Sequence, residues 1–596
     1  MPIKHLALAL TVSAIAFHGS QAQQVPTLPE TVDGPIGRMM HEYLTRAAQL
    51  GFSGQVLAAK DGKILLHQAY GFSDRRHEIP ITTSTSVGVA SMSKQFTAAA
   101  ILKLATDGKL RLSDTLGAFF KGLPADKSGI TIQQIVTHTS GIRGGVTEDF
   151  DVGSLDSSMT RLMSLPLTGK PGEKWRYSSD AYGILAAIVQ NVSGMPFERY
   201  MHETILGPAG MSHSGFWHEA RDMGSVAHAY AGLRHSGTPA MWPRDWRVFG
   251  SGDLMTTASD LYRWDRALRA GRIFAGAALT QYSSGIVPIG SGSDMYGYGL
   301  FVTTTPRKTK LVEHGGDTEL GFNGAFFRYL DEDAVLIITS NARDVNFRSL
   351  RQYVQGELDR MLFGADTIKP PLALQRPSRP IQAGMTGSYQ IDSTSAFHIM
   401  SDGAYLWIGA DGQSAVDVLR AHSADVSPEM FANANRRTAT LIDALMRFDT
   451  TAYVVALGDS GAAELPDYRE EWKALLEQMG PIRGYRVLGS MRQGGSLVTT
   501  VSLSFLRGDK PMSFMWSALG RGRLVGSNVL SPSPYPVVLP LGVDSEGKLV
   551  AYDLWRVQTR ATFSPLKDGR LGVLSAGIPN AASITTQRRS LAEWMH

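Results

Sequence analysis

The chain has no cysteine among its 596 residues. Disulfides, thiolate zinc sites, a cysteine nucleophile and a lipidated N-terminal cysteine are therefore excluded together. Basic residues are not concentrated either, because 58 Lys and Arg against 54 Asp and Glu leave a formal charge of only +4. They occur in short pairs such as Arg436-Arg437. A nucleic-acid partner is not expected, since its footprint needs clustered Lys and Arg.

The one long apolar run of the sequence is at the N-terminus, from Leu6 to Phe17. It follows Lys4, and a small-x-small sequence that ends at Ala22 comes after it. The run is too short for a membrane-spanning helix, which needs about 20 residues. This pattern predicts a secretory signal peptide over residues 1–22. We therefore expect a periplasmic or secreted protein without a transmembrane anchor.

The common motifs for bound metals and cofactors are also absent. The sequence has no His-Glu-x-x-His, and none of its 15 histidines pairs with another at helical spacing, so no protein-held metal is expected. Gly-x-Ser-x-Gly, a Walker A loop and a dinucleotide-binding glycine fingerprint do not occur. The acidic stretch from Glu148 to Asp151 favours a solvated loop over a metal site. We expect neither a metal nor an organic cofactor.

With 43% hydrophobic residues the chain can bury an ample core. Asp61-Gly62 stands between two apolar runs and predicts a hairpin with a type I′ turn. Apolar periodicity predicts helices over 91–107, 179–194 and 259–270, and strands over 311–314, 324–329 and 334–339. A sheet made from both ends of one domain, with helices between, is therefore predicted for residues 34–365.

The remainder of the chain differs from the first 365 residues in its composition and in the pattern of its apolar residues. Four prolines between Pro370 and Pro380 predict an extended linker over 366–380. Short alternating runs then predict a small β unit over 381–422. Residues 423–596 are expected to form an α+β accessory domain. Its expected elements are a helix over 467–479 and strands over 497–506 and 535–541.

Ser-x-x-Lys occurs three times, beginning at Ser91, Ser545 and Ser564. Its chemistry requires the serine at the first turn of a helix, where residues i and i+3 share a face. Only the Ser91 copy opens an apolar helix. Burial of Lys94 there would lower the pKa of its amine and let it accept the Ser91 proton. On the motif alone, a lysine that simply reaches solvent remains the alternative.

Two further motifs follow in order. Tyr177-Ser178-Ser179 precedes the second helix, and His314-Gly315-Gly316 ends a predicted strand. Each alone has a structural explanation, a semi-buried tyrosine or a strand exit. Together with Ser91-x-x-Lys94 they resemble the three-element active site of the serine β-lactamase and penicillin-binding-protein superfamily. The likeness is greatest to class C β-lactamases and their D-alanyl-D-alanine carboxypeptidase, D-aminopeptidase and esterase relatives, and it covers about residues 35–365.

The resemblance implies an α+β fold, in which an antiparallel sheet is flanked by helices in an αβα sandwich with an all-helical insertion. A C-terminal β-rich α+β region would follow. The resemblance also implies that Ser91 is the nucleophile and that Lys94 and Tyr177 share the role of base. His314 would stand beside the substrate carboxylate or carbonyl group.

The remaining site residues are assigned in the same way. The oxyanion hole would use the backbone N–H groups of Ser91 and Asp317. Gly315 and Gly316 would leave room for the substrate to approach the strand. Ser179 stands where the family has Asn, so it keeps a donor and an acceptor but loses the reach of the amide.

We therefore expect a secreted serine hydrolase that forms an acyl-enzyme on Ser91 and acts on a small-molecule or peptide substrate. Esters and D-amino-acid peptides are the expected substrates. β-Lactams should be turned over slowly at most, because His314 and Ser179 are weaker anchors than Lys and Asn. The alternative is a non-catalytic sensor of β-lactams or peptidoglycan fragments, or a scaffold, with the same fold. The sequence indicates no partner for the accessory domain.

Overall fold

The structure of the chain is a computed structural model. It describes residues 28–144, 153–344, 348–365, 368–420, 427–447, 449, 451–458, 469, 472–473, 475–493, 495–517, 523–528, 535–553, 558–565, 571–575, 584–585 and 587–589. The predicted signal peptide over 1–22 and the acidic stretch 148–151 lie outside these residues. Within the predicted helix over 467–479, the described residues 469, 472–473 and 475–479 are helical, in agreement with the sequence. Among the described residues, no helix is both long and apolar enough to cross a membrane.

A nine-stranded antiparallel sheet organises the first 365 residues. Its order is β1–β3–β2–β16–β15–β14–β13–β12–β11. The strands are β1 (Thr31–Val32), β2 (Gly54–Lys60), β3 (Lys63–Tyr70), β11 (Val287–Pro288), β12 (Met295–Tyr296), β13 (Phe301–Thr304), β14 (Lys310–Asp317), β15 (Asn323–Tyr329) and β16 (Ala334–Ser340). Because β2 pairs with β16 along its whole length, the two ends of this domain meet in mid-sheet, as the sequence predicts.

The hairpin between β2 and β3 follows from its two turn residues. Asp61 and Gly62 have φ angles of 51° and 73°. Positive φ at both central positions defines the type I′ turn, whose twist suits adjacent antiparallel strands. The Asp-Gly signal in the sequence is therefore confirmed.

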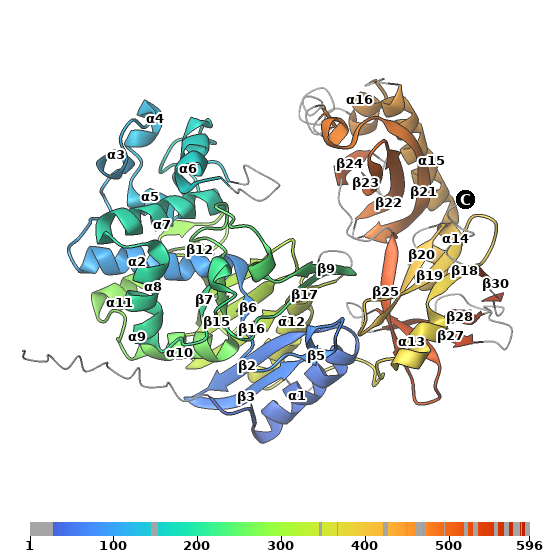
Figure 1. Cartoon of the computed structure of the whole chain (residues 1–596), viewed down its shortest axis with the longest axis horizontal. Helices are drawn as coiled ribbons and strands as arrows, with labels where there is room; N and C mark the ends of the chain where they lie inside the picture. Colours follow the sequence, from blue (N-terminus) through green and yellow to red (C-terminus); the bar gives the residue numbers. More distant parts are fainter. Residues whose placement is uncertain are drawn as a thin grey trace, which may run out of the picture.

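Helices cover both faces of the sheet (Figure 1). They are α1 (Gly34–Gln49) and α12 (Leu350–Leu362) on one face, and α2 (Lys94–Thr106), α7 (Ser179–Ser193) and α10 (Ala258–Arg269) on the other. Alternate residues of β16 enter two separate cores: Val335 and Ile337 pack on the α2 side, and Leu336 and Ile338 on the α1 side, as strand geometry requires. The architecture is an αβα sandwich of the α+β class.

The α2 face carries an additional helical lobe. Its elements include α3 (Leu116–Phe119), α4 (Ala125–Ser128), α5 (Ile132–Val136), α6 (Leu155–Ser164), α8 (Phe197–Met201), the π-helical turn η2 (His202–Leu206), α9 (Gly207–Ala209) and α11 (Ala277–Tyr282). Short strands and turns join it to the sheet: β4 (Phe72–Asp74), β5 (Ile79–Pro80), β6 (Val87–Gly88), β7 (Gly215–Phe216), β8 (Ala229–Ala231), β9 (Arg234–Gly237), β10 (Leu254–Thr256), β17 (Ala342–Arg343) and the 3₁₀ turns η1 (Ala90–Ser93), η3 (Trp217–Glu219) and η4 (Pro239–Met241).

The C-terminal part is built around a second nine-stranded sheet, in the order β29–β28–β27–β26–β25–β20–β19–β18–β30. Its strands are β18 (Gly387–Gln390), β19 (Ala396–Ser401), β20 (Leu406–Asp411), β25 (Val537–Val543), β26 (Leu549–Asp553), β27 (Gln558–Pro565), β28 (Leu571–Ser575), β29 (Ile584–Thr585) and β30 (Gln587–Arg589). Only one residue separates β29 from β30, yet they pair with β28 and β18 at opposite edges. The two edges of the sheet therefore lie near each other, and the sheet runs across the boundary that the sequence suggests at residue 422.

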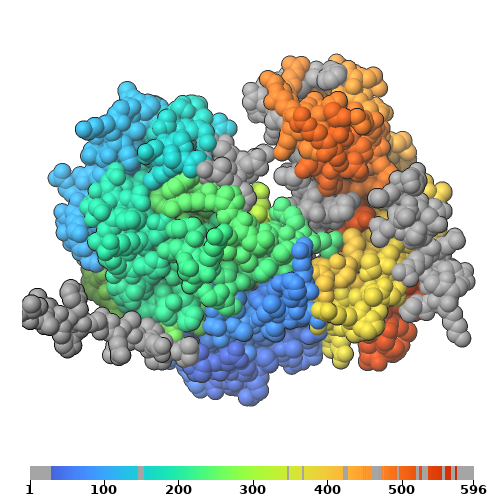
Figure 2. Space-filling view, in the orientation of Figure 1, coloured from blue at the N-terminus to red at the C-terminus, as the bar shows by residue number. Residues whose placement is uncertain are grey.

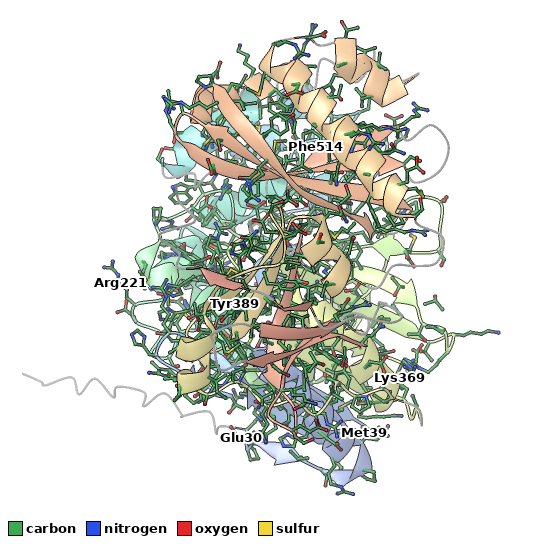
Figure 3. The ribbon with its side chains drawn as sticks, turned by 90° about the vertical axis from the view of Figure 1, so that its right-hand side faces the viewer. Glu30, Met39, Arg221, Lys369, Tyr389 and Phe514 are labelled. Carbon is green, nitrogen blue, oxygen red and sulfur yellow. The ribbon has the colours of Figure 1, made fainter. Side chains whose placement is uncertain are left out.

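A third sheet is inserted between β20 and β25. It consists of β21 (Ile482–Gln493), β22 (Ser496–Phe505), β23 (Gly508–Ser517) and β24 (Leu524–Asn528). The helices around the two C-terminal sheets are α13 (Arg379–Met385), α14 (Gln413–Leu419), α15 (Pro428–Met446) and α16 (Thr451–Leu457). Phe514 and Tyr389 belong to different hydrophobic cores and lie well apart in Figure 3.

The segment between the two parts, around residues 368–378, is extended and makes hydrogen bonds with the C-terminal sheet. The Leu372 N–H donates to the hydroxyl of Tyr552, and Gln375 bridges to Val543. The helix α13 already begins at Arg379, inside the linker range inferred from the prolines. Figure 2 shows the yellow first part of the C-terminal region packed against the blue N-terminal strands. The two parts are therefore joined by specific contacts as well as by the chain.

Candidate active site

Ser91 lies in the 3₁₀ turn η1, and Lys94 is the first residue of α2. A 3₁₀ turn has three residues per turn, so the side chains at i and i+3 eclipse one another. The Lys94 Nζ is accordingly 3.0 Å from the Ser91 Oγ. The helix predicted from Ser91 is thus a 3₁₀ turn that continues as an α-helix. The Ser545 copy of the motif lies in an exposed turn and the Ser564 copy on strand β27, so only the first copy stands at a helix start.

The Lys94 amine is fully buried and has three polar neighbours. They are the Ser91 Oγ at 3.0 Å, the Ser179 Oγ at 3.2 Å and the backbone carbonyl of Ser251 at 3.0 Å. Burial lowers the pKa of Lys94 to about 7, against the opposing influence of Asp180 and Asp253. A neutral amine has two N–H groups and one lone pair, which suits two acceptors and the hydroxyl proton of Ser91.

The Ser251 carbonyl is held by a turn that the sequence analysis assigned no role. The Gly250 N–H donates to the Asp253 carboxylate at 3.2 Å, and the Gly250 carbonyl accepts from the Thr97 hydroxyl at 2.6 Å. Burial raises the pKa of Asp253 to about 8. The turn is therefore fixed to α2 one helical turn beyond Lys94. The Gly-Ser-Gly-Asp run ahead of β10 indicates a turn, but nothing in it indicates the contact of that turn with Lys94.

Tyr177 lies in the loop just before α7, and its side chain also contacts Ser91. Its side chain is 37% exposed, yet its hydroxyl group hydrogen-bonds with Ser91 and Ser179, and burial raises its pKa. The Lys94 amine lies 4.9 Å from the centre of its ring. Tyr177 therefore combines a protonated inner hydroxyl with an accessible ring. Ser179 contacts both Lys94 and Tyr177, so the shorter side chain links the two groups.

His138 holds the loop that carries Tyr177. It has a left-handed φ of 58°, its carbonyl accepts from Arg176 N–H at 2.7 Å, and its Nδ1 accepts from Ser178 N–H at 3.2 Å. Its Nε2 is then the protonated nitrogen and lies 3.2 Å from the hydroxyl of Tyr296. These contacts show that His138 orders the turn ahead of Tyr177.

His314 is a buried, neutral imidazole on β14. Its Nδ1 donates to the carbonyl of Gly315, and its Nε2 lies 3.5 Å from the Tyr296 hydroxyl. Burial lowers the pKa of His314 to about 3, and the nearby Lys94 acts in the same direction. The imidazole of His314 is therefore neutral near pH 7.

The end of β14 presents an open backbone edge. Its pairing with β13 stops at Glu313, opposite Phe301, whereas its pairing with β15 continues to Asp317. The Thr318 N–H donates to the Phe322 carbonyl across this hairpin. Because bonded pairs alternate in antiparallel ladders, the backbone groups of Asp317 face away from β15, toward the open edge. The expected oxyanion donor at Asp317 is therefore unpaired by the sheet.

Gly315 and Gly316 leave room for neighbouring parts of the protein, and their expected role in admitting a substrate stays a prediction. A Cβ at Gly316 would lie 2.1 Å from the Val89 carbonyl and 2.8 Å from the Ser91 nitrogen. One at Gly315 would lie 2.8 Å from the guanidinium group of Arg351 on the opposite face. The absence of a side chain at Gly316 thus lets β14 lie close to η1, beside the backbone nitrogen of Ser91.

A family model described as Beta-lactamase matches residues 40–357. The chain belongs to the beta-lactamase family. Penicillin-binding protein 4* of Bacillus subtilis (strain 168) is 27% identical over 392 residues, which cover 62% of this chain and 86% of that protein. Protein flp of Staphylococcus aureus (strain NCTC 8325 / PS 47) is 30% identical over 219 residues, which cover 35% of this chain and 44% of that protein.

Solved structures resemble this beta-lactamase-family chain in fold. The octameric penicillin-binding protein homologue from Pyrococcus abyssi aligns with a TM-score of 0.50 and 18% sequence identity, over 93% of this chain and all of that one. At this identity the likeness shows the fold alone. The family match contains every candidate side chain from Ser91 to Asp317 and ends before the C-terminal sheets.

Proposed function

We propose that this protein is a serine hydrolase that forms an acyl-enzyme on Ser91. The observation that carries the proposal is the 3.0 Å contact between the Ser91 hydroxyl and a fully buried amine, Lys94, whose pKa is lowered to about 7. A nucleophilic serine needs an adjacent base of this kind. The family match supports the same reaction class. A metal or organic cofactor has no part in the proposed steps.

The acylation step uses Lys94 as the base. The neutral amine takes the Ser91 proton as the Oγ attacks the substrate carbonyl carbon. The resulting oxyanion accepts hydrogen bonds from the backbone N–H groups of Ser91 and Asp317, which are fixed before the reaction begins. The sequence interpretation divides the base role between Lys94 and Tyr177. The raised pKa of Tyr177 favours the lysine as base and the tyrosine as proton donor.

The leaving group takes its proton from Tyr177, and the tyrosine recovers one from the Lys94 ammonium group. Ser179 can relay that proton, since its hydroxyl lies 3.2 Å from Lys94 and hydrogen-bonds with Tyr177. Breaking the acyl–leaving-group bond leaves an ester on Ser91. Water then hydrolyses that ester with the same groups in reversed roles.

Esters and D-amino-acid peptides are the proposed substrates, with β-lactams turned over slowly. A neutral His314 gives a carboxylate no opposite charge. The alternative is a sensor or scaffold that is acylated without turnover, and Ser179 in place of Asn is the observation in its favour.

We also propose that the protein acts in the periplasm or is secreted, because residues 1–22 have the features of a signal peptide. N-terminal sequencing of the exported protein tests the location.

The intact mass of the protein after separate incubation with a fluorophosphonate and with a penicillin tests the proposal. We expect a stoichiometric fluorophosphonate adduct that peptide mapping locates to Ser91, and a penicillin adduct that decays slowly. Absence of any Ser91 adduct in folded protein contradicts the reaction class. Stable adducts combined with no turnover of esters, peptides or β-lactams would identify the sensor instead.

Activity should rise with pH through a single ionisation near 7. Below that pH, Lys94 is protonated and cannot accept the Ser91 proton, so kcat/KM should fall about tenfold per pH unit. His314 should add no inflection above pH 5, because its pKa lies near 3. The measurement is kcat/KM from pH 5 to 9 with an ester that does not ionise in this range. A flat profile would contradict the assignment of Lys94 as base.

A further inference from the structure

We propose that Trp175, Tyr177 and Phe301 form a subsite for a neutral, aromatic leaving group beside Ser91. This inference rests on the proposed function and adds a substrate class to it. It concerns the group that departs when the acyl-enzyme forms, whereas the acyl group remains on Ser91. The geometry of the three rings, the position of the proton donor and the pairing of the nearby cations each support it.

The three rings border the open end of the β14 edge. Phe301 is the first residue of β13 and pairs with Glu313, where the pairing of β14 with β13 stops. The centre of its ring lies 5.1 Å from that of His314. The Trp175 ring lies 6.3 Å from Phe301 and 6.2 Å from Tyr177. Tyr177 is 37% exposed, and Trp175 and Phe301 are half-buried. They therefore form an accessible aromatic wall around the imidazole of His314.

The reaction places the leaving group on this wall. The Tyr177 hydroxyl contacts Ser91 and donates a proton in the proposed mechanism, so the atom that departs must lie next to that hydroxyl. The oxyanion donor at Asp317 lies three residues beyond His314 along β14. A substrate held by that donor has its carbonyl oxygen at the Asp317 end. Its leaving group then extends over Tyr177 and His314 toward Phe301 and Trp175.

The two basic side chains that lower the pKa of His314, Lys94 and Arg351, both have other polar partners. Lys94 has polar contacts with Ser91, Ser179 and the carbonyl of Ser251. Arg351 lies on the opposite face of the sheet, where it binds Asp317 at 2.9 Å and Gln355 at 2.8 Å. A leaving group with a carboxylate would lose water without gaining a counter-charge. A flat neutral ring instead meets aromatic faces at stacking distance.

Three esters separate the possibilities. Methyl 3-acetoxybenzoate has a neutral aromatic leaving group, and 3-acetoxybenzoate has the same ring with a carboxylate. 2,2,2-Trifluoroethyl phenylacetate has its ring on the acyl side. The variants are Trp175→Leu and Phe301→Leu, with Phe363→Leu as the matched control. Phe363 packs against Tyr329, beside the core on the α1 face, away from the proposed site. Labelling of Ser91 by a fluorophosphonate is measured in every protein.

We expect the wild type to prefer the neutral aryl ester over its carboxylate by at least about tenfold in kcat/KM. Trp175→Leu and Phe301→Leu should each lower kcat/KM for the neutral aryl ester about 3–10-fold, mainly through KM, as loss of one aromatic contact predicts. The trifluoroethyl ester should change less than twofold. Phe363→Leu should change none of the three.

The outcomes keep the two proposals distinct. A wild type that is neither labelled at Ser91 nor active on any ester refutes the proposed function. A labelled, active wild type that prefers the carboxylate overturns only the subsite inference. Variants that slow the trifluoroethyl ester equally, with normal labelling, also overturn it, because the rings would then serve the acyl side. If Phe301→Leu does not fold, Trp175→Leu on the loop before α7 decides the question.

Discussion

Replacing Ser91 by alanine should lower kcat about 10³-fold or more while leaving the fold intact, because covalent catalysis disappears with the hydroxyl. The substitution removes one oxygen from a partly exposed side chain and leaves the η1 turn in place, so the thermal unfolding midpoint should shift little. Steady-state hydrolysis of an activated ester measures the effect. Ser545→Ala, in the exposed second copy of the motif, is the matched control and should retain full activity.

Lys94→Ala should be nearly as damaging, since Ser91 would lose its base. The Ser91→Ala/Lys94→Ala double variant should lose little beyond the worse single change, because both residues act in one proton transfer. Wild-type rates in folded Ser91→Ala would end the hypothesis of a serine nucleophile. Effects that multiply in the double variant would instead indicate that the two residues act in separate steps.

The parts of the fold that local patterns determine could be predicted from the sequence. The Asp61-Gly62 turn, the apolar helix before Gly194 and the strand pair around residue 332 each depend on neighbouring residues. The Ser-x-x-Lys contact could also be predicted, because a spacing of three places both side chains on one face of a helix or a 3₁₀ turn.

The contacts that complete the candidate site depend on distant residues. The Ser251 carbonyl that binds Lys94 lies 157 positions along the chain, and Tyr296 lies 158 positions from His138. The guanidinium group of Arg351, which fills the space at Gly315, comes from α12. No periodicity or short motif encodes such pairs, so the sequence analysis could name the reacting side chains but not the groups that fix them.

The C-terminal sheet is the clearest case of non-local structure. β20 and β25 are neighbours in the sheet, although the third sheet and the helices α14, α15 and α16 separate them in the chain. Strands were predicted from the sequence at both places, but the partner of a strand is not specified by its own pattern. The predicted boundary between a small β unit and an accessory domain at residue 422 followed a change in the sequence pattern. The sheet, however, takes strands from both sides of that residue.

Asp402→Ala should destabilise the protein by about 3–5 kcal/mol, because it leaves a buried guanidinium group without its counter-ion. Asp402 is 2% exposed and binds Arg75, which is 0% exposed, at 2.9 Å. The Arg75 guanidinium lies between the rings of Tyr230, at 4.7 Å, and Tyr405, at 5.2 Å. Its other hydrogen bond, to the Gly51 carbonyl, supplies no charge. Urea unfolding followed by tryptophan fluorescence measures the loss.

The control for this prediction is Glu78→Gln. It weakens the more exposed pairs of Glu78 with Arg376 and Arg379, and surface pairs contribute about 0–1 kcal/mol. Arg75→Met combined with Asp402→Leu should recover much of the loss, because it removes both charges together. A loss below about 1 kcal/mol in Asp402→Ala would show that Arg75 finds another partner.

The ion pair between Arg75 and Asp402 also predicts the stability of a shortened chain that ends near Gly364. All the proposed catalytic residues precede that point, so such a chain should still be acylated at Ser91 if it folds. However, it lacks Asp402 and Tyr405 and exposes the unpaired Arg75, and it should therefore be less stable than the full chain by at least the Asp402→Ala loss. Introducing Arg75→Met into the shortened chain should then raise its stability and its soluble yield. Folded, soluble protein that no fluorophosphonate labels would instead show that residues after 364 complete the active site.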